Sequence, residues 1–309
     1  MISKDVSRWL VKRIGKVKLG HVGTLDPAAS GVLPILLGRA TKLQDFLLEM
    51  PKSYEFDVAF GTETDTLDQD GTVVRESAWD HITENALEAA ISRFIGDIEQ
   101  TPPIYSAVKY KGKPLYDYAR SSDRASLDEQ VPLDSLKRKV NVSSFEMLRF
   151  KPGVASFRVR CSKGTYVRSL ARDLAESVDS CATLTRLVRT QAAGVPIESS
   201  LTLDSIESDL EKFADRIVPM AKIRTALVSF CCPNSLVVSK LQQGQRVTVA
   251  LDEYLGCLDA GDPSLAISGQ SSIPSSLAES VLLLSDNGAA FGVGSVRRHL
   301  SGRVEIALK

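Results

Sequence analysis

The 309-residue sequence has few of the residues that mark metal sites and disulfide frameworks. It contains five cysteines and three histidines, and neither a Cys-x-x-Cys nor a His-x-x-x-His spacing occurs among them. We therefore expect no disulfides and no metal site. An excess of charge of either sign is also missing, because 38 basic residues balance 38 acidic ones. A neutral chain counts against a nucleic-acid-binding protein unless its basic residues gather locally.

Long apolar runs are absent as well. No run reaches the roughly 18 residues of a membrane helix, and the first residues lack the apolar stretch of a signal peptide. We expect a cytoplasmic protein that does not enter a membrane. A Walker loop, a dinucleotide-binding fingerprint and a Gly-x-Ser-x-Gly elbow are also missing, which counts against the common nucleotide-binding and hydrolase sites.

The hydrophobic pattern predicts strands and helices that are joined mostly by hairpins. Apolar and polar residues alternate from Tyr54 to Phe60, which indicates a half-buried strand beginning at Tyr54. Two further strands, 145–150 and 155–161, flank the turn residues Lys-Pro-Gly and predict a hairpin. This arrangement favours an α+β fold with a mixed, mainly antiparallel sheet and flanking helices.

Changes in composition predict two domains. Residues 1–228 form the larger one, and residues 229–309, with short strand-like pieces between glycines and serines, form a small β domain. Within the larger domain, residues 121–140 are polar and aperiodic, so we predict a mobile surface insertion there.

One acidic residue, Asp26, stands alone in the stretch "KLGHVGTLDPAASGVLPILLG". The proline that follows it disfavours helical backbone, and glycines at 20, 23 and 31 allow tight bends or a close approach to a ligand. The stretch therefore places a carboxylate on a stiff turn. The alternative, which turn statistics favour for an isolated Asp-Pro, is that Asp26 is a simple turn or cap residue.

A possible partner of this carboxylate lies in "CSKGTYVRSLARDLAESV". Thr165 is a good N-cap for a helix, which would put Arg168 in the first turn. A cation there opposes the helix dipole unless an anion lies nearby. That anion could be a phosphate of a ligand or the carboxylate of Asp26. The alternative is a solvated arginine.

Other motifs carry less information. The acidic turn "TDTLDQDG" has Thr66 where a calcium loop needs aspartate, and it lacks the final glutamate, so we predict a solvated turn. His21 could act in catalysis or hydrogen-bond the turn. Two groups of basic residues could hold phosphates or could be solvated: Lys4, Arg8, Lys12, Arg13, Lys16 and Lys18, and Lys109, Lys111 and Lys113.

Four ordered segments resemble the bacterial tRNA pseudouridine-55 synthases, the TruB family. They are "GHVGTLDPAASGVLPILLGRATKL", "KSYEFDVAFGTETDTLDQDG", "TPPIYSAVKYKGKPLYDYAR" and "CSKGTYVRSLARDLAES". The resemblance covers roughly residues 3 to 195. It implies a pseudouridine-synthase-like mixed domain around a long antiparallel sheet, followed by a PUA-like β domain that binds RNA. It also implies that neither a metal nor an organic cofactor is used.

The resemblance implies a function for the pocket residues. Asp26 would be the catalytic aspartate that isomerises uridine 55 in the T-loop of tRNA, after the base has flipped out of the RNA. Tyr54 would lie against that base, Arg168 would pair with the aspartate, and Leu187 would form an apolar wall. The partner would be the T-arm of tRNA, and we expect the protein to be a monomer.

Three further residues are implicated in RNA binding. His21 matches the histidine of the family's Gly-His-x-Gly, close to the RNA loop, while Lys18 and Lys109 would hold the RNA backbone. The chain departs from the family in having Val188 where a second arginine is common and in lacking a glycine in "SVDSCATL". It also lacks the upstream Asp-Lys-Pro-x-Gly segment, from which we expect either a misassigned start or a missing edge strand.

Two other functions fit parts of this pattern. The first is a non-catalytic protein that binds or folds tRNA on the same scaffold. The second is a hydrolase with an aspartate nucleophile, although no Asp-x-Asp pair surrounds Asp26. Retention of Asp26, Tyr54 and Arg168 together favours the synthase.

Overall fold

The computed structural model describes residues 2–121, 131–223, 229–250, 258–259, 280–285, 289–298 and 303–308. The chain divides into two compact units. The first comprises Met1–Ile2, Thr24–Leu33 and Glu49–Ser200, and the second comprises Ser3–Gly23, Pro34–Leu48 and Leu201–Lys309. Two early segments thus belong to the second unit, and the linear boundary after residue 228 stays a prediction. The boundary itself adjoins residues 224–228, which lie outside the described residues.

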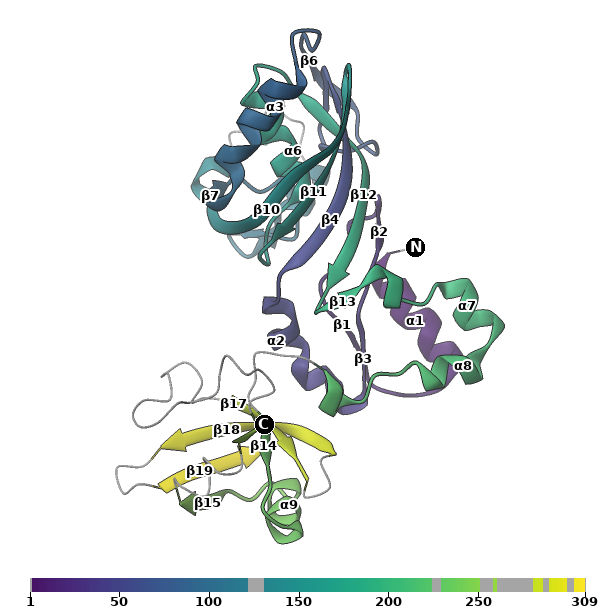
Figure 1. Ribbon diagram of the computed structural model, residues 1–309, viewed down its shortest axis with the longest axis vertical. Helices are drawn as coiled ribbons and strands as arrows, with labels where there is room; N and C mark the ends of the chain where they lie inside the picture. The colour runs from purple at the N-terminus through teal and green to yellow at the C-terminus, as the bar shows by residue number, and fades with distance from the viewer. Residues whose placement is uncertain are drawn as a thin grey trace. The chain divides into compact units, whose positions relative to one another are not determined.

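A seven-stranded sheet forms the centre of the first unit (Figure 1). All its strand pairs are antiparallel except that of β2 (Ala29–Gly31), which runs parallel to β12. The mainly antiparallel α+β fold is therefore confirmed. The other strands, in spatial order, are β13 (Val195–Pro196), β12 (Ala182–Ala192), β4 (Lys52–Phe60), β11 (Val154–Cys161), β10 (Arg138–Lys151) and β7 (Gly96–Gln100).

Two helices cover one face of this sheet, α3 (Glu84–Ile91) and α6 (Val167–Glu176), as Figure 1 shows. Aromatic side chains from β4, β10 and β11 pack beneath them, and Phe56 and Phe157 are fully buried with ring centroids 5.3 Å apart. Burying apolar area of this kind is the main favourable term in folding. The remaining short elements are β5 (Thr62–Thr64), β6 (Val73–Glu76), η2 (Ser92–Phe94), β8 (Lys109–Tyr110), β9 (Lys113–Pro114), α4 (Leu115–Ser121), η3 (Leu133–Leu136) and η4 (Ile197–Ser199).

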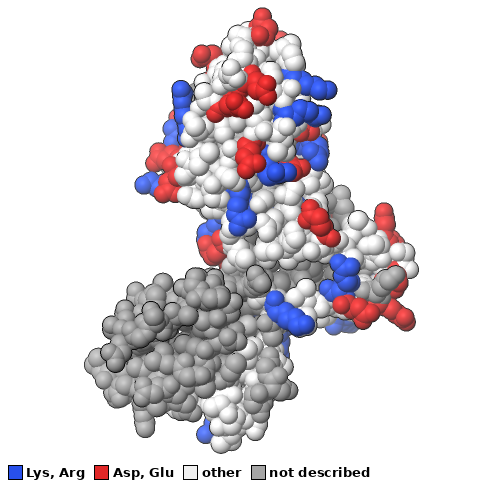
Figure 2. Space-filling model, in the orientation of Figure 1, with Lys and Arg blue, Asp and Glu red and all other residues white. Residues whose placement is uncertain are grey.

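The opposite face of the sheet is polar. Strand β4 alternates as predicted, although it begins at Lys52, two residues earlier than expected. Its outward carboxylates pair across strands, Glu55 with Arg158 at 2.8 Å and Asp57 with Arg186 at 3.8 Å. Charges of both signs also lie side by side on the face of the molecule seen in Figure 2. Because Arg158 and Arg186 are already paired with carboxylates, the polar face of the sheet is a poor phosphate-binding surface.

The second unit contains a six-stranded sheet, as expected for a C-terminal β region. Its strands, in spatial order, are β15 (Val247–Ala250), β19 (Arg303–Leu308), β18 (Ala290–Arg298), β17 (Ser280–Leu284), β14 (Ser229–Cys231) and β16 (Leu258–Asp259). Its other elements are α1 (Ser3–Ile14), β1 (Leu19–His21), β3 (Ile35–Leu37), η1 (Gly38–Leu43), α2 (Gln44–Glu49), α7 (Leu203–Ser208), α8 (Leu210–Asp215), η5 (Met220–Lys222) and α9 (Ser235–Gln242). Among the described helices, none has the length and apolar character to cross a membrane.

The predicted insertion at 121–140 is described only in part. Residues 122–130 lie outside the described residues, and α4 ends at Ser121. After this gap, residues 131–140 contain η3 and the first residues of β10.

Candidate active site

Asp26 lies on a turn that is tied to the edge of the large sheet. The amide of Ala29 donates to the Asp26 carbonyl at 2.9 Å, and β2 then pairs with β12. Gly31, with a φ of +104°, is essential to this attachment, because a Cβ there would lie 2.2 Å from the carbonyl oxygen of Arg189. Close approach is therefore the function of this glycine, and the surface it approaches is a strand backbone.

Arg168 is the second residue of α6 and its side chain is only 5% exposed. The N-cap of this helix is Tyr166, so the prediction of Thr165 was wrong by one residue. The Thr165 hydroxyl instead donates to the Ser162 carbonyl at 3.0 Å. Arg168 nevertheless lies in the first turn as predicted, where a positive charge is unfavourable without an anionic partner.

The guanidinium of Arg168 makes a hydrogen bond through each of its three nitrogens. Nε and one terminal nitrogen both lie 2.9 Å from Oδ2 of Asp26. The terminal nitrogens also reach the carbonyls of Thr66 at 2.8 Å and Tyr105 at 3.0 Å, and Oδ2 of Asp68 at 3.5 Å. Asp26 is the anion that the sequence left unidentified, and its Oδ1 accepts no hydrogen bond from the described residues.

Asp68 corrects the prediction of a solvated acidic turn. Its side chain is 7% exposed, and its Oδ1 accepts from the Thr66 hydroxyl at 2.6 Å and from the amide of Asp70 at 3.1 Å. Arg168 therefore lies between two carboxylates. Sequence reasoning missed Asp68 because nothing local shows that this turn folds against the start of a distant helix.

A small open cavity of about 90 Å³ lies beside Asp26. Burial raises the pKa of the Tyr54 hydroxyl in its wall to about 12, although the neighbouring Arg189 lowers it in part. Tyr54 is consequently a neutral phenol at neutral pH. Leu187 supplies a buried apolar wall. The complete lining is Thr24, Leu25, Asp26, Ala29, Tyr54, Thr165, Tyr166, Val167 and Leu187.

The structure thus brings together Asp26, Tyr54, Arg168 and Leu187. The other predicted residues are not in this group. Lys109 is exposed in β8 and does not line the cavity. Exposed Lys18 and half-buried His21 belong to the second unit, so a function of either one beside Asp26 stays a prediction.

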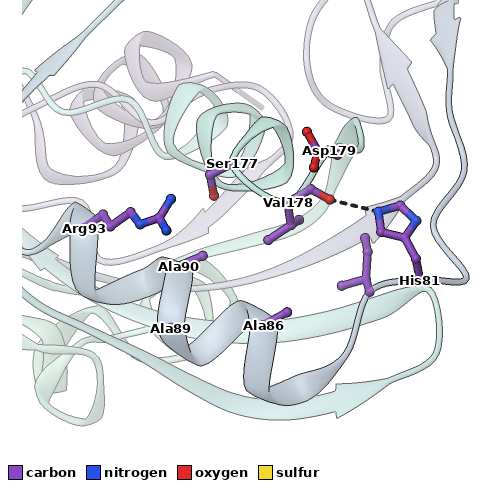
Figure 3. Close-up of a pocket in the computed structure, with 9 residues that line it drawn as sticks. His81, Ala86, Ala89, Ala90, Arg93, Ser177, Val178 and Asp179 are labelled. Carbon is purple, nitrogen blue, oxygen red and sulfur yellow. Dashed lines mark hydrogen bonds between the residues drawn. The ribbon is translucent and has the colours of Figure 1, made fainter.

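A second, larger cavity of about 260 Å³ lies between α3 and the end of α6 (Figure 3). Alanines of α3 line one side, and Arg93 and His81 stand at opposite ends. The His81 ring is engaged with the Val178 carbonyl at 2.9 Å. Its ionisable lining residues, His81, Arg93 and Asp179, form no ion pair with one another in the described part of the chain, so its greater size does not make it the better candidate. No group of three or more potential metal ligands occurs within the described ranges.

Comparison with known proteins identifies the family. Residues 11–167 match the TruB family pseudouridylate synthase (N terminal domain). A relative from Caldanaerobacter subterraneus subsp. tengcongensis is 43% identical over 208 residues, 67% of this chain and 70% of the relative. A relative from Azoarcus sp. (strain BH72) is 42% identical over 218 residues, 71% of this chain and 70% of the relative. Both are named tRNA pseudouridine synthase B.

Solved structures support the fold. The chain is similar to one in "Crystal Structure of a Cbf5-Nop10-Gar1 Complex", with a TM-score of 0.67, 22% identity and coverage of 97% of this chain and 76% of that one. A chain in "Crystal structure of the archaeal box H/ACA sRNP Nop10-Cbf5 complex" has a TM-score of 0.65 and 20% identity, with coverage of 100% and 81%.

Proposed function

This chain belongs to the TruB family of pseudouridylate synthases, and we propose that it converts the uridine at position 55, in the T-loop of tRNA, to pseudouridine with Asp26 as the reacting group. The family and the names of the relatives support tRNA pseudouridylation. The position in the tRNA and the function of Asp26 rest on the resemblance of the motifs and on the geometry around the carboxylate.

The reaction is an isomerisation without a redox change. The C1'–N1 bond breaks, the base turns, and a C1'–C5 bond forms. The proton on C5 leaves to solvent and N1 gains one, so atoms balance without a co-reactant. A carboxylate can take part by attacking the sugar or the base, or by removing a proton from C2'.

The observation that carries this proposal is the pairing of Asp26 with Arg168. Asp26 is 33% exposed at a cavity, whereas its partner is 5% exposed and fixed by five contacts. One carboxylate oxygen is held by Arg168, and the other accepts no hydrogen bond from the described residues. This arrangement suits a group that must meet a substrate atom in one orientation.

The cavity walls suit a base that has left its stack. A flipped base gains about 1–3 kcal/mol by stacking on an aromatic ring. Two aromatic residues, Tyr54 and Tyr166, line the cavity together with Asp26, and Tyr54 is the one that the family resemblance places against the base. The phenol of Tyr54, with a pKa of about 12, serves as a hydrogen-bond donor at neutral pH.

The test is tritium release from a tRNA transcript that carries uridine labelled at C5. The wild-type protein should release one equivalent of tritium per tRNA, and a transcript with cytidine in place of uridine 55 should release none. Carbodiimide labelling and primer extension then locate the product. Release from another uridine would contradict the assigned position, and tight binding without release would favour the non-catalytic tRNA-binding protein.

A further inference from the structure

Arg189 is the largest fully buried side chain in the described part of the chain, at 1% exposure. It lies in β12, directly opposite Tyr54 on β4 and beside Gly31 on β2. An arginine cannot lose its charge on burial, so its burial is costly unless its donors are well used. The acceptors of this guanidinium therefore indicate what the residue does.

Those acceptors lie at the two ends of the segment that carries Asp26. Nε of Arg189 donates to the carbonyl of Val32 at 2.8 Å, and a terminal nitrogen donates to the carbonyl of Thr24 at 3.4 Å. The amide of Val32 returns a bond to the Arg189 carbonyl at 2.9 Å. Thr24 is the first residue of the segment Thr24–Leu33 in this unit, and Val32 is the last but one. The Arg189 side chain thus links the two ends of the segment that carries Asp26.

The same guanidinium reaches the aromatic wall of the cavity. A hydrogen bond from Arg189 and its positive charge both lower the pKa of the Tyr54 hydroxyl, against the larger effect of burial. Arg189 therefore contacts the Asp26 segment and Tyr54 at once, although it does not line the cavity.

We propose that Arg189 is a positioning residue, which holds the Asp26 turn and the Tyr54 hydroxyl in fixed relation so that the carboxylate meets the uridine in a reactive geometry. The proposal rests on the proposed function of Asp26. It predicts that loss of Arg189 slows the chemical step and leaves tRNA affinity nearly unchanged, since the buried guanidinium cannot contact a phosphate.

The experiment compares Arg189→Lys and Arg189→Gln with a matched control, Arg186→Lys, which alters an exposed arginine three residues earlier on the same strand. Lysine keeps the charge, but its three donors radiate from one atom and cannot reproduce the planar fork. Each variant is first checked for a cooperative melt. Two quantities are then measured under conditions where every variant is fully folded. The first is the rate of single-turnover tritium release at saturating protein, and the second is the affinity for tRNA.

We expect folded Arg189→Lys to lose about tenfold or more in saturating rate, with a Kd within about threefold of wild type and Arg186→Lys unchanged. A wild-type rate in either folded Arg189 variant would overturn the proposal. Loss of the cooperative melt in both Arg189 variants would also overturn it, because Arg189 would then serve stability alone.

A readout independent of activity separates this proposal from the proposed function. Deuterium uptake by the peptide spanning residues 24–33, measured without tRNA, should rise in the folded Arg189 variants and not in Arg186→Lys. If the wild-type protein were inactive but the variants showed this pattern of uptake, the proposed synthase function would be contradicted, whereas the proposal that Arg189 positions the Asp26 segment would stand. An unchanged uptake would contradict the positioning even in an active enzyme.

Discussion

Replacing Arg168 by lysine tests the arrangement of the candidate site most directly. The arginine makes five contacts, with Asp26 through two nitrogens and with Thr66, Tyr105 and Asp68. A lysine offers three N–H donors from one atom, so at least two contacts are lost. The charge is kept, which separates geometry from electrostatics.

The magnitude follows from these losses. A buried acceptor left without a donor costs about 1–3 kcal/mol, so two of them lower the free energy of unfolding by about 2–6 kcal/mol. If one of the lost bonds is to Asp26, and that bond contributes about 1.5–3 kcal/mol to transition-state stabilisation, the reaction slows roughly 10- to 150-fold. Affinity for tRNA should stay nearly constant, because Arg168 is too buried to meet a phosphate.

The assay is single-turnover tritium release at saturating protein, preceded by urea unfolding to establish that the variant is folded. Arg172→Lys is the matched control, since Arg172 lies one turn later in the same helix and pairs with its neighbour Asp173 at 2.6 Å. The control should react within about twofold of wild type, as expected for a change away from the reacting groups. A folded Arg168→Lys protein with a rate near that of wild type would refute this account of the site.

Three further changes test the remaining parts of the site. Asp26→Asn should lose at least about 100-fold in rate with tRNA binding intact, and residual turnover above about 1% would count against a catalytic carboxylate. Asp68→Asn should slow the single-turnover rate by less than Asp26→Asn does, because it removes the second carboxylate beside Arg168 but leaves the first; an unchanged rate would make Asp68 purely structural. With Tyr54→Phe, the free energy of unfolding should fall less steeply as the pH rises through the alkaline range than it does in the wild type. The raised pKa keeps Tyr54 protonated in the fold to about pH 12, whereas the unfolded phenol ionises near pH 10, so wild-type stability falls between these values by up to about 2.7 kcal/mol more than in the variant. Urea unfolding at several pH values measures this difference.

Local signals in the sequence singled out both residues at the centre of the site, although only the family resemblance paired them. The Asp-Pro turn places an isolated carboxylate among glycines, and Arg168 places a cation where it opposes the helix dipole. The hydrogen bond between Arg168 and Asp26 gives each charge its partner. The antiparallel hairpin around residues 151–153 could also be predicted, because alternation and turn residues are both local. The division into units could not, since segments 3–23 and 34–48 join residues far along the chain.

The two buried residues that sequence reasoning missed differ in what could have revealed them. Asp68 gives no signal, because its burial depends on a contact with residue 168, a hundred positions later. Arg189 does give one. It follows Leu187 at a spacing of two, so strand periodicity alone puts an arginine on the same inward face as an apolar residue. An inward arginine in a strand is costly and indicates a fixed set of acceptors.

The exposed fractions of the three charged side chains in the site indicate different functions for them. Asp26 is one-third exposed, while Arg168 and Asp68 are 5% and 7% exposed. The trio comprises two carboxylates and one guanidinium, and the buried Arg189 adds a second guanidinium beside Tyr54 and the Asp26 segment. Any route in which the C1'–N1 bond weakens before the new bond forms leaves the sugar deficient in electrons. Asp26 is the carboxylate that can stabilise such a sugar directly, because it is the one exposed at the cavity, where fixed charges act strongly if water is partly excluded. Asp68, 7% exposed, does not line the cavity and contacts Arg168, so it would act by holding Arg168 in place, and Arg168 would in turn hold Asp26 at the cavity.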